Sequence, residues 1–172
     1  MKGDTRTAGT QACRLEQLVT QYQTELLHMC CLYLRDAALA EDAVQETFLK
    51  AYLALDRFRG DCSEKTWLTR IAVNTCRDML RCAWLRHTDR SMTPEMLPAA
   101  SVPFEEKDEA LILAVMELPL RLREAVVLHY GQGLSVKEIA GMLSRTPSTI
   151  SNRLKRAVQK LRAALERSGW HE

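Results

Sequence analysis

The stretch SRTPSTISNRLKR, residues 144–156, joins a predicted turn to a predicted helix. Thr146 has the short polar side chain that caps helices, and Pro147 suits the first helical turn, where its missing N–H needs no partner. Farther along, apolar residues recur at steps of three and four, the spacing of one helical face. This predicted buried stripe contains Ile150, Leu154, Val158, Leu161 and Leu165. The stretch therefore predicts a final amphipathic helix.

The opposite side of this helix is polar and positively charged. A helical turn of about 3.6 residues places five residues on that face and two more at its edges. The face contains Ser148, Asn152, Lys155, Arg156 and Gln159, and the edges contain Ser151 and Arg153. Arg and Asn side chains can read base edges, whereas Ser and Lys side chains can hold phosphates. For a basic face taken alone, the alternative is a solvated helix of a bundle.

The residues before this helix favour DNA binding over that alternative. Ser135 and Glu138 have the spacing of a capping box, which predicts a short helix that ends near Leu143. The turn LSRT then leads into the basic helix. Two helices joined by a short turn, the second with an exposed polar face, are typical of a helix-turn-helix. In that motif the first helix crosses the phosphates and the second enters the major groove.

The N-terminal half is also helical by its periodicity. Apolar stripes predict helices over residues 15–33, 38–55 and 64–85, and we expect these helices to form a three-helix bundle. The segment between the second and third helices, DRFRGDCSEK, is polar and favours a loop because of its Gly, Asp and Ser residues. No stretch of useful length alternates with period two, so the sequence predicts an all-α fold.

The chain divides into two parts at a segment rich in proline. Residues 88–104 hold three of the five prolines and show no sustained apolar period, which indicates a linker. The part that follows contains a predicted helix over residues 120–129, ended by two glycines, and then the helix-turn-helix. We therefore expect two small helical domains, residues 1–87 and 105–172, joined by a proline-containing linker.

Charge is unevenly distributed along the 172 residues, although the formal net charge is only +2. Residues 36–46 contain four acids and no base, whereas residues 145–167 contain seven bases and one acid. No apolar run is long enough to span a membrane, and the polar start of the chain lacks the apolar core of a signal peptide. The sequence predicts a cytoplasmic protein without stable membrane insertion.

The chain has six cysteines but no Cys-x-x-Cys motif. The nearest cluster of metal-binding residue types is His28 with Cys30 and Cys31, which do not all share one face of a helix. We expect no metal site and no other cofactor, and reduced thiols in the cytosol. A thiol-based redox or metal sensor remains a third interpretation of the chain.

A second basic region lies between residues 57 and 90, where eight bases outnumber four acids. Trp67, Asn74 and several arginines follow one another there, beside the polar loop. Aromatic and basic side chains together suit contact with unstacked bases and their backbone. In the alternative interpretation, Trp67 belongs to the core and the arginines are solvated. The residues alone leave both interpretations open.

Three segments resemble one family of proteins. They are DAVQETFLKAY, FRGDCSEKTWLTRIAVNTCRDML and LSVKEIAGMLSRTPSTISNRLKRA. In this order they closely resemble the extracytoplasmic-function group of bacterial RNA polymerase sigma factors, over about residues 15–165. The resemblance implies an initiation factor, not itself an enzyme, that binds core RNA polymerase and promoter DNA. It also implies an anti-sigma factor as a regulatory partner.

The resemblance further assigns roles to residues. The N-terminal domain would melt and read the minus-ten element as a single strand, with the loop of residues 58–66 capturing a flipped-out base, and the C-terminal domain would read the minus-thirty-five element as duplex. The implied minus-ten residues are Phe58, Arg59, Lys65, Thr66, Asn74, Arg77 and Arg81. The implied minus-thirty-five residues are Ser148, Ser151, Asn152, Arg153, Lys155 and Arg156. The implied contacts to the coiled coil of the largest polymerase subunit are Asp42, Gln45 and Glu46.

The runner-up interpretation is a free-standing transcriptional regulator. Its helix-turn-helix would bind a duplex operator without polymerase, and its N-terminal bundle would dimerise or sense a signal. A sigma factor differs in that specific promoter opening requires core polymerase.

Overall fold

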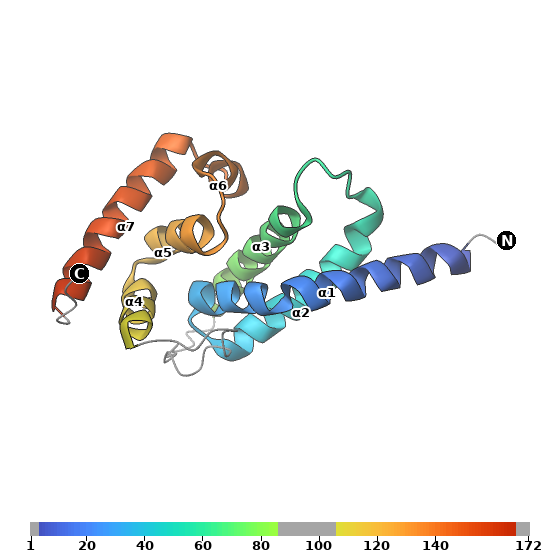
Figure 1. The fold of residues 1–172 in the computed structure, drawn as a ribbon, viewed down its shortest axis with the longest axis horizontal. Helices are drawn as coiled ribbons and strands as arrows, with labels where there is room; N and C mark the ends of the chain where they lie inside the picture. Colours follow the sequence, from blue (N-terminus) through green and yellow to red (C-terminus); the bar gives the residue numbers. More distant parts are fainter. Residues whose placement is uncertain (1–3, 86–105, 168–172) are drawn as a thin grey trace.

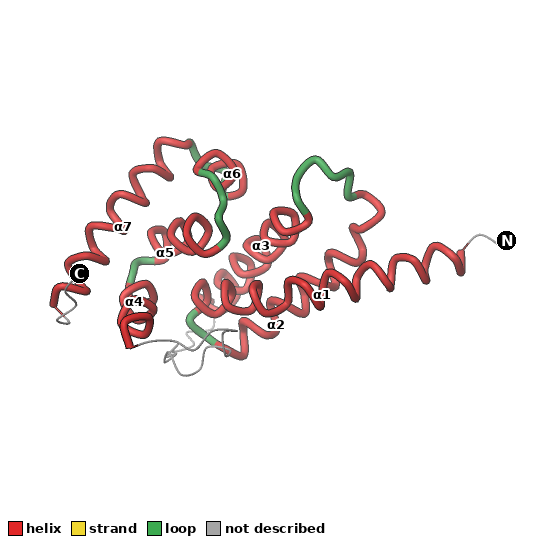
Figure 2. The backbone as a smooth tube through the Cα atoms, viewed as in Figure 1, coloured by secondary structure: helices red, strands yellow, loops and turns green. Residues whose placement is uncertain are grey.

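The computed structural model describes residues 4–85 and 106–167, and these residues form helices joined by short connections. Figures 1 and 2 show the helices in two groups, α1 to α3 and α4 to α7, and no strand occurs within these two ranges. The prediction of an all-α fold is confirmed. The linker predicted at residues 88–104 lies outside the described residues.

The N-terminal group consists of α1 (Asp4–Leu34), α2 (Ala37–Ala54), the short 3-10 turn η1 (Leu55–Arg57) and α3 (Glu64–Leu85). Its three helices pack against one another around buried apolar and small side chains. Asp36 begins α2, where its carboxylate accepts a hydrogen bond from the backbone N–H of Leu39 at 2.9 Å. The three predicted helices are confirmed, but α1 begins well before residue 15. Its apolar stripe starts only at Leu15, so periodicity could not reveal the earlier turns.

The C-terminal group consists of α4 (Glu106–Glu117), α5 (Leu120–Val126), the π-helical segment η3 (Val127–Gly131), α6 (Val136–Met142) and α7 (Pro147–Arg167). The single helix predicted over residues 120–129 is therefore α5 continued by a π-helical segment. Apolar spacing does not distinguish these two backbone forms, because the side chains stay on nearly the same face over so few residues.

The predicted caps of the helix-turn-helix are confirmed. The hydroxyl of Ser135 accepts from the backbone N–H of Glu138, whose carboxylate accepts from the backbone N–H of Ser135 at 2.9 Å. Thr146 accepts from the backbone N–H of Thr149 at 3.3 Å, and Pro147 is the first residue of α7. Ser144, in the turn between α6 and α7, has a φ of 53°, which polar turn residues tolerate better than branched ones.

The buried stripe of α7 differs from the prediction at one position. Ala157 is fully buried, whereas Val158, which was predicted to be buried, is only half-buried. The stripe consists of Ile150, Leu154, Ala157, Leu161 and Leu165. The buried face returns after three residues at Ala157 because 3.6 residues per turn is not a whole number. None of the described helices is long and apolar enough to cross a bilayer.

Candidate nucleic-acid interface

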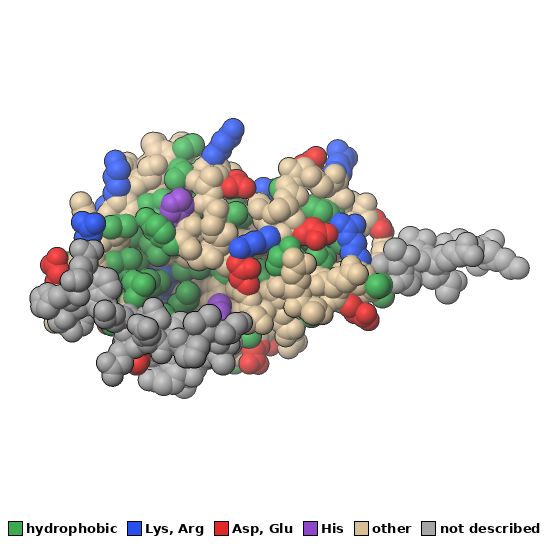
Figure 3. Space-filling model, in the orientation of Figure 1, with side chains coloured by type: hydrophobic (Ala, Val, Ile, Leu, Met, Phe, Trp, Pro, Cys, Tyr) green, Lys and Arg blue, Asp and Glu red, His purple; other side chains and the backbone are tan. Residues whose placement is uncertain are grey.

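The polar face of α7 is exposed as its spacing predicted. Ser148, Asn152, Lys155 and Arg156 are exposed, and Ser151 is half-buried at the edge of this face. Lys and Arg side chains project from the side of the molecule where α7 lies (Figure 3). Asn152 and Arg156 also line a groove between α7 and the start of α5. The exposed side of α7 therefore combines positive charge with hydrogen-bonding groups that match base edges and phosphates.

Arg153 lies differently from the rest of this face. Its Nη1 donates to Oε1 of Glu124 on α5 at 2.8 Å, and the two side chains are only 13% and 9% exposed. Sequence periodicity placed Arg153 at the edge of the polar face, but did not reveal this partner. The ion pair fixes α7 against α5, so the geometry supports a role for Arg153 in orienting the exposed residues of α7.

Glu124 also joins the two groups of helices. Its Oε2 accepts from the hydroxyl of Tyr33 at the end of α1, at 2.8 Å. Burial and the neighbouring Glu124 carboxylate raise the pKa of the Tyr33 hydroxyl, which therefore stays protonated and donates. Arg123 donates to the backbone carbonyl of Tyr33 at 3.1 Å and to two carbonyls at the end of α4. These contacts place α1 beside α4 and α5, as Figure 1 shows.

Sequence analysis missed this buried network. The available signal was the adjacent pair Arg123 and Glu124 inside LRLREAVV, a segment otherwise rich in buried apolar residues. Charged side chains are rarely so buried unless they are paired. The pattern could have indicated an internal ion pair, although it could not have named Arg153 or Tyr33 as partners.

The loop before α3 holds its aromatic residue in place. Phe58 stacks on Trp67 with ring centroids 4.7 Å apart, and the guanidinium of Arg14 lies 5.8 Å from the Phe58 ring centroid. Gly60 has a φ of 76°, a conformation that side chains disfavour. The hydroxyl of Ser63 accepts from the backbone N–H of Thr66 at 3.0 Å and so caps α3. Trp67 is thus packed, as the alternative interpretation expected, and its ring supports Phe58.

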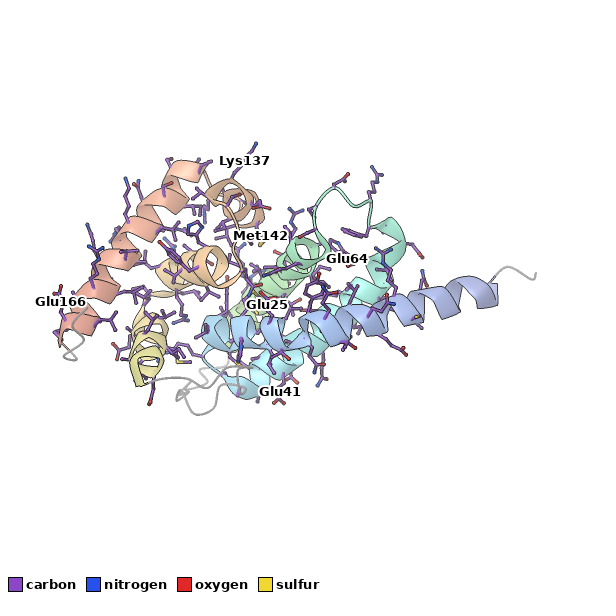
Figure 4. The ribbon with its side chains drawn as sticks, in the orientation of Figure 1. Glu25, Glu41, Glu64, Lys137, Met142 and Glu166 are labelled. Carbon is purple, nitrogen blue, oxygen red and sulfur yellow. The ribbon has the colours of Figure 1, made fainter. Side chains whose placement is uncertain are left out.

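Of the other residues predicted at the minus-ten surface, some are held inside the protein and some are exposed. Lys65 forms an ion pair with Glu25 of α1, and Thr66 is buried. The labelled Glu25 and Glu64 mark where α1 faces the start of α3 (Figure 4). Exposed members lie elsewhere, with Arg59 in the loop and Asn74 and Arg81 on α3. Asn74, Arg77 and Arg81 are spaced by three and four residues, and Arg77 is half-buried. These three residues therefore share one side of α3.

The predicted polymerase surface is an exposed face of α2. Asp42 and Gln45 are exposed, and Glu46 forms an i,i+4 ion pair with Lys50 at 3.4 Å. Two leucines that the sequence analysis missed continue the same face, with Leu49 55% and Leu53 73% exposed. The sequence signal that could have revealed them is their spacing: Leu49 lies three residues after Glu46, and Leu53 lies four residues after Leu49, so all three share one side of the helix. The surface is therefore acidic at one end and apolar at the other.

Three of the six cysteines, Cys30, Cys31 and Cys76, are buried in the core, whereas Cys13 and Cys82 are exposed and Cys62 is half-buried. The thiols of Cys30 and Cys76 are buried with their sulfurs 3.6 Å apart, and this hydrogen bond and burial raise the pKa of Cys30. Burial raises the pKa of Cys31 to about 12. Neutral thiols are poor nucleophiles and poor metal ligands. Among the described residues, no group of three His, Cys, Asp or Glu side chains could hold a metal ion.

Comparisons with known families define the class of this protein. Residues 18–86 match Sigma-70 region 2, and residues 108–161 match Sigma-70 region 4. These two regions in this order are those of a sigma factor of bacterial RNA polymerase. A free-standing regulator would account for the second match but not for the first, so that alternative is not favoured.

Individual relatives show to which group of sigma factors the chain belongs. The chain is 32% identical to the RNA polymerase sigma-H factor of Pseudomonas aeruginosa, over 87% of this chain and 84% of the relative. It is 33% identical to the ECF RNA polymerase sigma-E factor of Escherichia coli K12, over 81% of this chain and 80% of the relative. The chain therefore belongs to the extracytoplasmic-function sigma factors.

Solved structures share the fold. The sigma factor RpoE, solved in complex with the anti-sigma factor NepR from Bartonella quintana, has a TM-score of 0.76 at 23% identity. The alignment covers 88% of this chain and 96% of that one. CnrH, solved with the cytosolic domain of CnrY, has a TM-score of 0.63 at 28% identity, and the alignment covers 88% and 87% of the two chains.

Proposed function

We propose that this sigma factor directs promoter-specific initiation through three surfaces, each on a different element. The α2 face docks on core RNA polymerase, the loop before α3 and α3 itself hold the melted minus-ten strand, and α7 reads the minus-thirty-five duplex. One observation carries this proposal. Three helices, α2, α3 and α7, each bury one side in the protein and expose another, and the exposed side is acidic and apolar on α2 but basic on α3 and α7. The factor works in the cytoplasm and leaves catalysis to the polymerase.

The α2 surface suits a basic protein partner with an apolar patch. Asp42, Gln45 and Glu46 supply negative charge and hydrogen bonds, which favour encounter with a basic surface. Leu49 and Leu53 supply exposed apolar area that becomes buried on docking. We therefore add these two leucines to the residues proposed to contact the polymerase.

The minus-ten surface suits a single strand. The stacked Phe58 and Trp67 form an aromatic support next to the exposed Arg59 in the loop, and Asn74 and Arg81 offer an exposed amide and an exposed guanidinium farther along α3. Flipping a base out of the duplex costs a few kcal/mol, so a preformed support and nearby positive charge offset that cost. Arg77 completes the basic side of α3 next to Asn74.

The α7 surface suits the major groove of duplex DNA. The exposed Asn152 and Arg156 reach base edges, and Ser148, Ser151 and Lys155 hold the backbone. Arg153 holds the helix against α5 through its ion pair with Glu124, and it also lines the groove beside Asn152 and Arg156.

Use of both promoter elements requires the two groups of helices to separate. Elements centred at minus ten and minus thirty-five lie about 25 base pairs apart, or about 85 Å along B-form DNA. The helices α1, α4 and α5 are in direct contact here. The domain division proposed from the sequence, at residues 88–104, allows this separation, during which the bond between Tyr33 and Glu124 breaks.

An anti-sigma factor is the proposed regulatory partner. One similar solved structure is a sigma factor in complex with an anti-sigma factor, and another is CnrH in complex with the cytosolic domain of CnrY. The exposed leucines of α2 give such a partner an apolar anchor on the same face that docks on polymerase, so binding of the two would be mutually exclusive.

In vitro transcription tests the proposed function. Purified core RNA polymerase transcribes fragmented genomic DNA with and without this protein, and new start sites are mapped. We expect discrete starts that depend on the protein and share two spaced upstream elements. An absence of new starts, together with tight DNA binding by the folded protein alone, would refute the proposal in favour of a free-standing regulator.

A further inference from the structure

A groove of about 300 Å³ separates the start of α5 from the first turns of α7. Its lining contains three guanidinium groups, one amide and one hydroxyl, and no carboxylate. The lining residues are Arg121, Leu122, Thr149, Asn152, Arg153 and Arg156. Arg121 was not among the residues assigned to DNA, and it lies outside the helix-turn-helix of α6 and α7.

The charge in this groove is only partly neutralised. Arg153 pairs with Glu124, so its charge is balanced within the protein. Arg121 and Arg156 form no ion pair within residues 4–85 and 106–167. Both are exposed, and the buried Leu122 also lines the groove. The groove therefore carries two uncompensated positive charges beside an apolar side chain.

Two guanidinium groups that face one groove favour an oxyanion. A guanidinium group donates two parallel N–H groups to phosphate oxygens. A phosphate of DNA fits the position better than a carboxylate of a protein, because Asn152 and Arg156 belong to both the groove and the proposed base-reading face. DNA read by those two residues brings backbone charges to their edge, since a duplex carries one charge about every 1.7 Å.

We propose that this groove binds one backbone phosphate beside the minus-thirty-five element, held by Arg121 from α5, and that Arg156 from α7 faces both this phosphate and the base edge proposed for it. This inference rests on the proposed function and extends it to a residue outside the helix-turn-helix. A phosphate contact from α5 fixes the depth and angle at which α7 enters the major groove, and carries no base preference itself. The exposed side chain of Arg121 makes this contact without altering the packing of α5.

The test uses holoenzyme formed with the full chain and a promoter identified by transcription mapping. Each phosphate around the minus-thirty-five element is replaced singly by a neutral methylphosphonate, and binding is measured at several salt concentrations. Arg121→Ala should weaken binding about threefold to tenfold and lower the slope of log affinity against log salt by about 0.9. One methylphosphonate should weaken binding of the wild type, and should weaken binding of Arg121→Ala less, because only Arg156 then faces that phosphate.

Matched variants isolate the phosphate contact. Arg162→Ala removes an exposed arginine of α7 that does not line the groove, and should leave the effect of every methylphosphonate unchanged. Arg121→Lys keeps the charge and should retain most of the salt slope. The affinity lost in Arg121→Ala should also be the same for the original promoter and for promoters with altered minus-thirty-five bases, because a phosphate contact does not distinguish bases.

Two results would overturn the site. The first is wild-type promoter binding whose salt slope and methylphosphonate profile are both unchanged in Arg121→Ala, which would leave the proposed function intact. The second is unchanged DNA binding with weakened binding of an acidic protein partner, which would assign the groove to protein recognition. A wild-type holoenzyme without promoter-specific binding would instead refute the function and the site together.

Discussion

The two surfaces assigned to DNA differ in how many of their residues are engaged inside the protein. On α7, four of the six assigned residues are exposed, and Arg153 is the one drawn into a nearly buried ion pair. Around α3, only three of the seven are exposed. Phe58 stacks on Trp67, Lys65 pairs with Glu25, and Thr66 is buried.

This difference matches the two forms of DNA. A duplex already has its shape, so a rigid helix with exposed side chains is enough to read it. A flipped base must be received by a shaped support, and a shaped support needs side chains held by other parts of the protein. The comparison separates residues proposed to contact DNA from residues that hold the contact surface in place. Mutation of the first kind should weaken DNA binding, and mutation of the second kind should lower the stability of the fold.

The largest effect should come from Arg153, which holds α7. Arg153→Ala leaves the Glu124 carboxylate buried without its cation, and should lower the free energy of unfolding by about 3–5 kcal/mol. Arg156→Ala, a change of the same residue type on the exposed face, should alter it by less than about 0.5 kcal/mol. Urea unfolding followed by circular dichroism measures both.

A double variant distinguishes loss of the ion pair from loss of packing. Arg153→Met with Glu124→Gln removes both charges and keeps similar volumes, so it should recover much of the stability. Equal and small losses in Arg153→Ala and Arg156→Ala would contradict the division between holding and contacting residues on α7.

The second effect concerns promoter use by the exposed residues of α7. Asn152→Ala or Arg156→Ala should weaken promoter binding by about 1–3 kcal/mol if the side chain reads a base, with no change in unfolding. Binding of holoenzyme to promoters with single base changes is the measurement. Unchanged affinity and unchanged base preference in both variants would remove them from the reading surface.

The sequence predicted features whose causes lie within a few residues. The caps at Ser135 and Thr146 and the periodicity of α7 are local, so they could be identified without the structure. Two differences were not local. The partner of Arg153 lies 29 residues away on α5, and the role of Tyr33 depends on contact between two groups of helices. The burial of Ala157 in place of Val158 is local, and arises because the helical repeat is not a whole number.

Periodicity also has a limit at surfaces. It assigns each residue to a face of its helix, but it does not say whether another helix covers that face. Leucines in a helix are expected in the core, so Leu49 and Leu53 were not recognised as surface residues, although both are exposed. Lys65 was assigned to DNA by resemblance, and the structure pairs it with Glu25. The contact roles themselves remain predictions for both surfaces.

A smaller effect should come from the cap of α3. Ser63→Ala removes the hydroxyl that accepts from the backbone N–H of Thr66, and should cost about 1 kcal/mol of unfolding free energy. Because the cap holds the loop before α3, promoter opening should fall more than duplex binding does. Permanganate reactivity of the minus-ten strand measures opening, and Ser63→Asp, which keeps a capping oxygen, serves as the control. Equal opening in Ser63→Ala and wild type would show that the loop needs no fixed shape.

The smallest effect should be the pH dependence of the α6 capping box. Hydrogen bonds from Ser135 lower the pKa of Glu138 below its usual value, so folding favours the carboxylate. This stabilisation is complete above the unfolded pKa of about 4.3 and is lost as the pH falls through the lower, folded value. Glu138→Gln keeps an acceptor for the Ser135 N–H but does not titrate, so wild type should lose more stability than Glu138→Gln between pH 6 and pH 3.5. Urea midpoints measured across that range test this difference. Parallel curves for the two proteins would show that the hydrogen bonds from Ser135 do not favour the Glu138 carboxylate in the folded state, and that α6 is held by its buried residues alone.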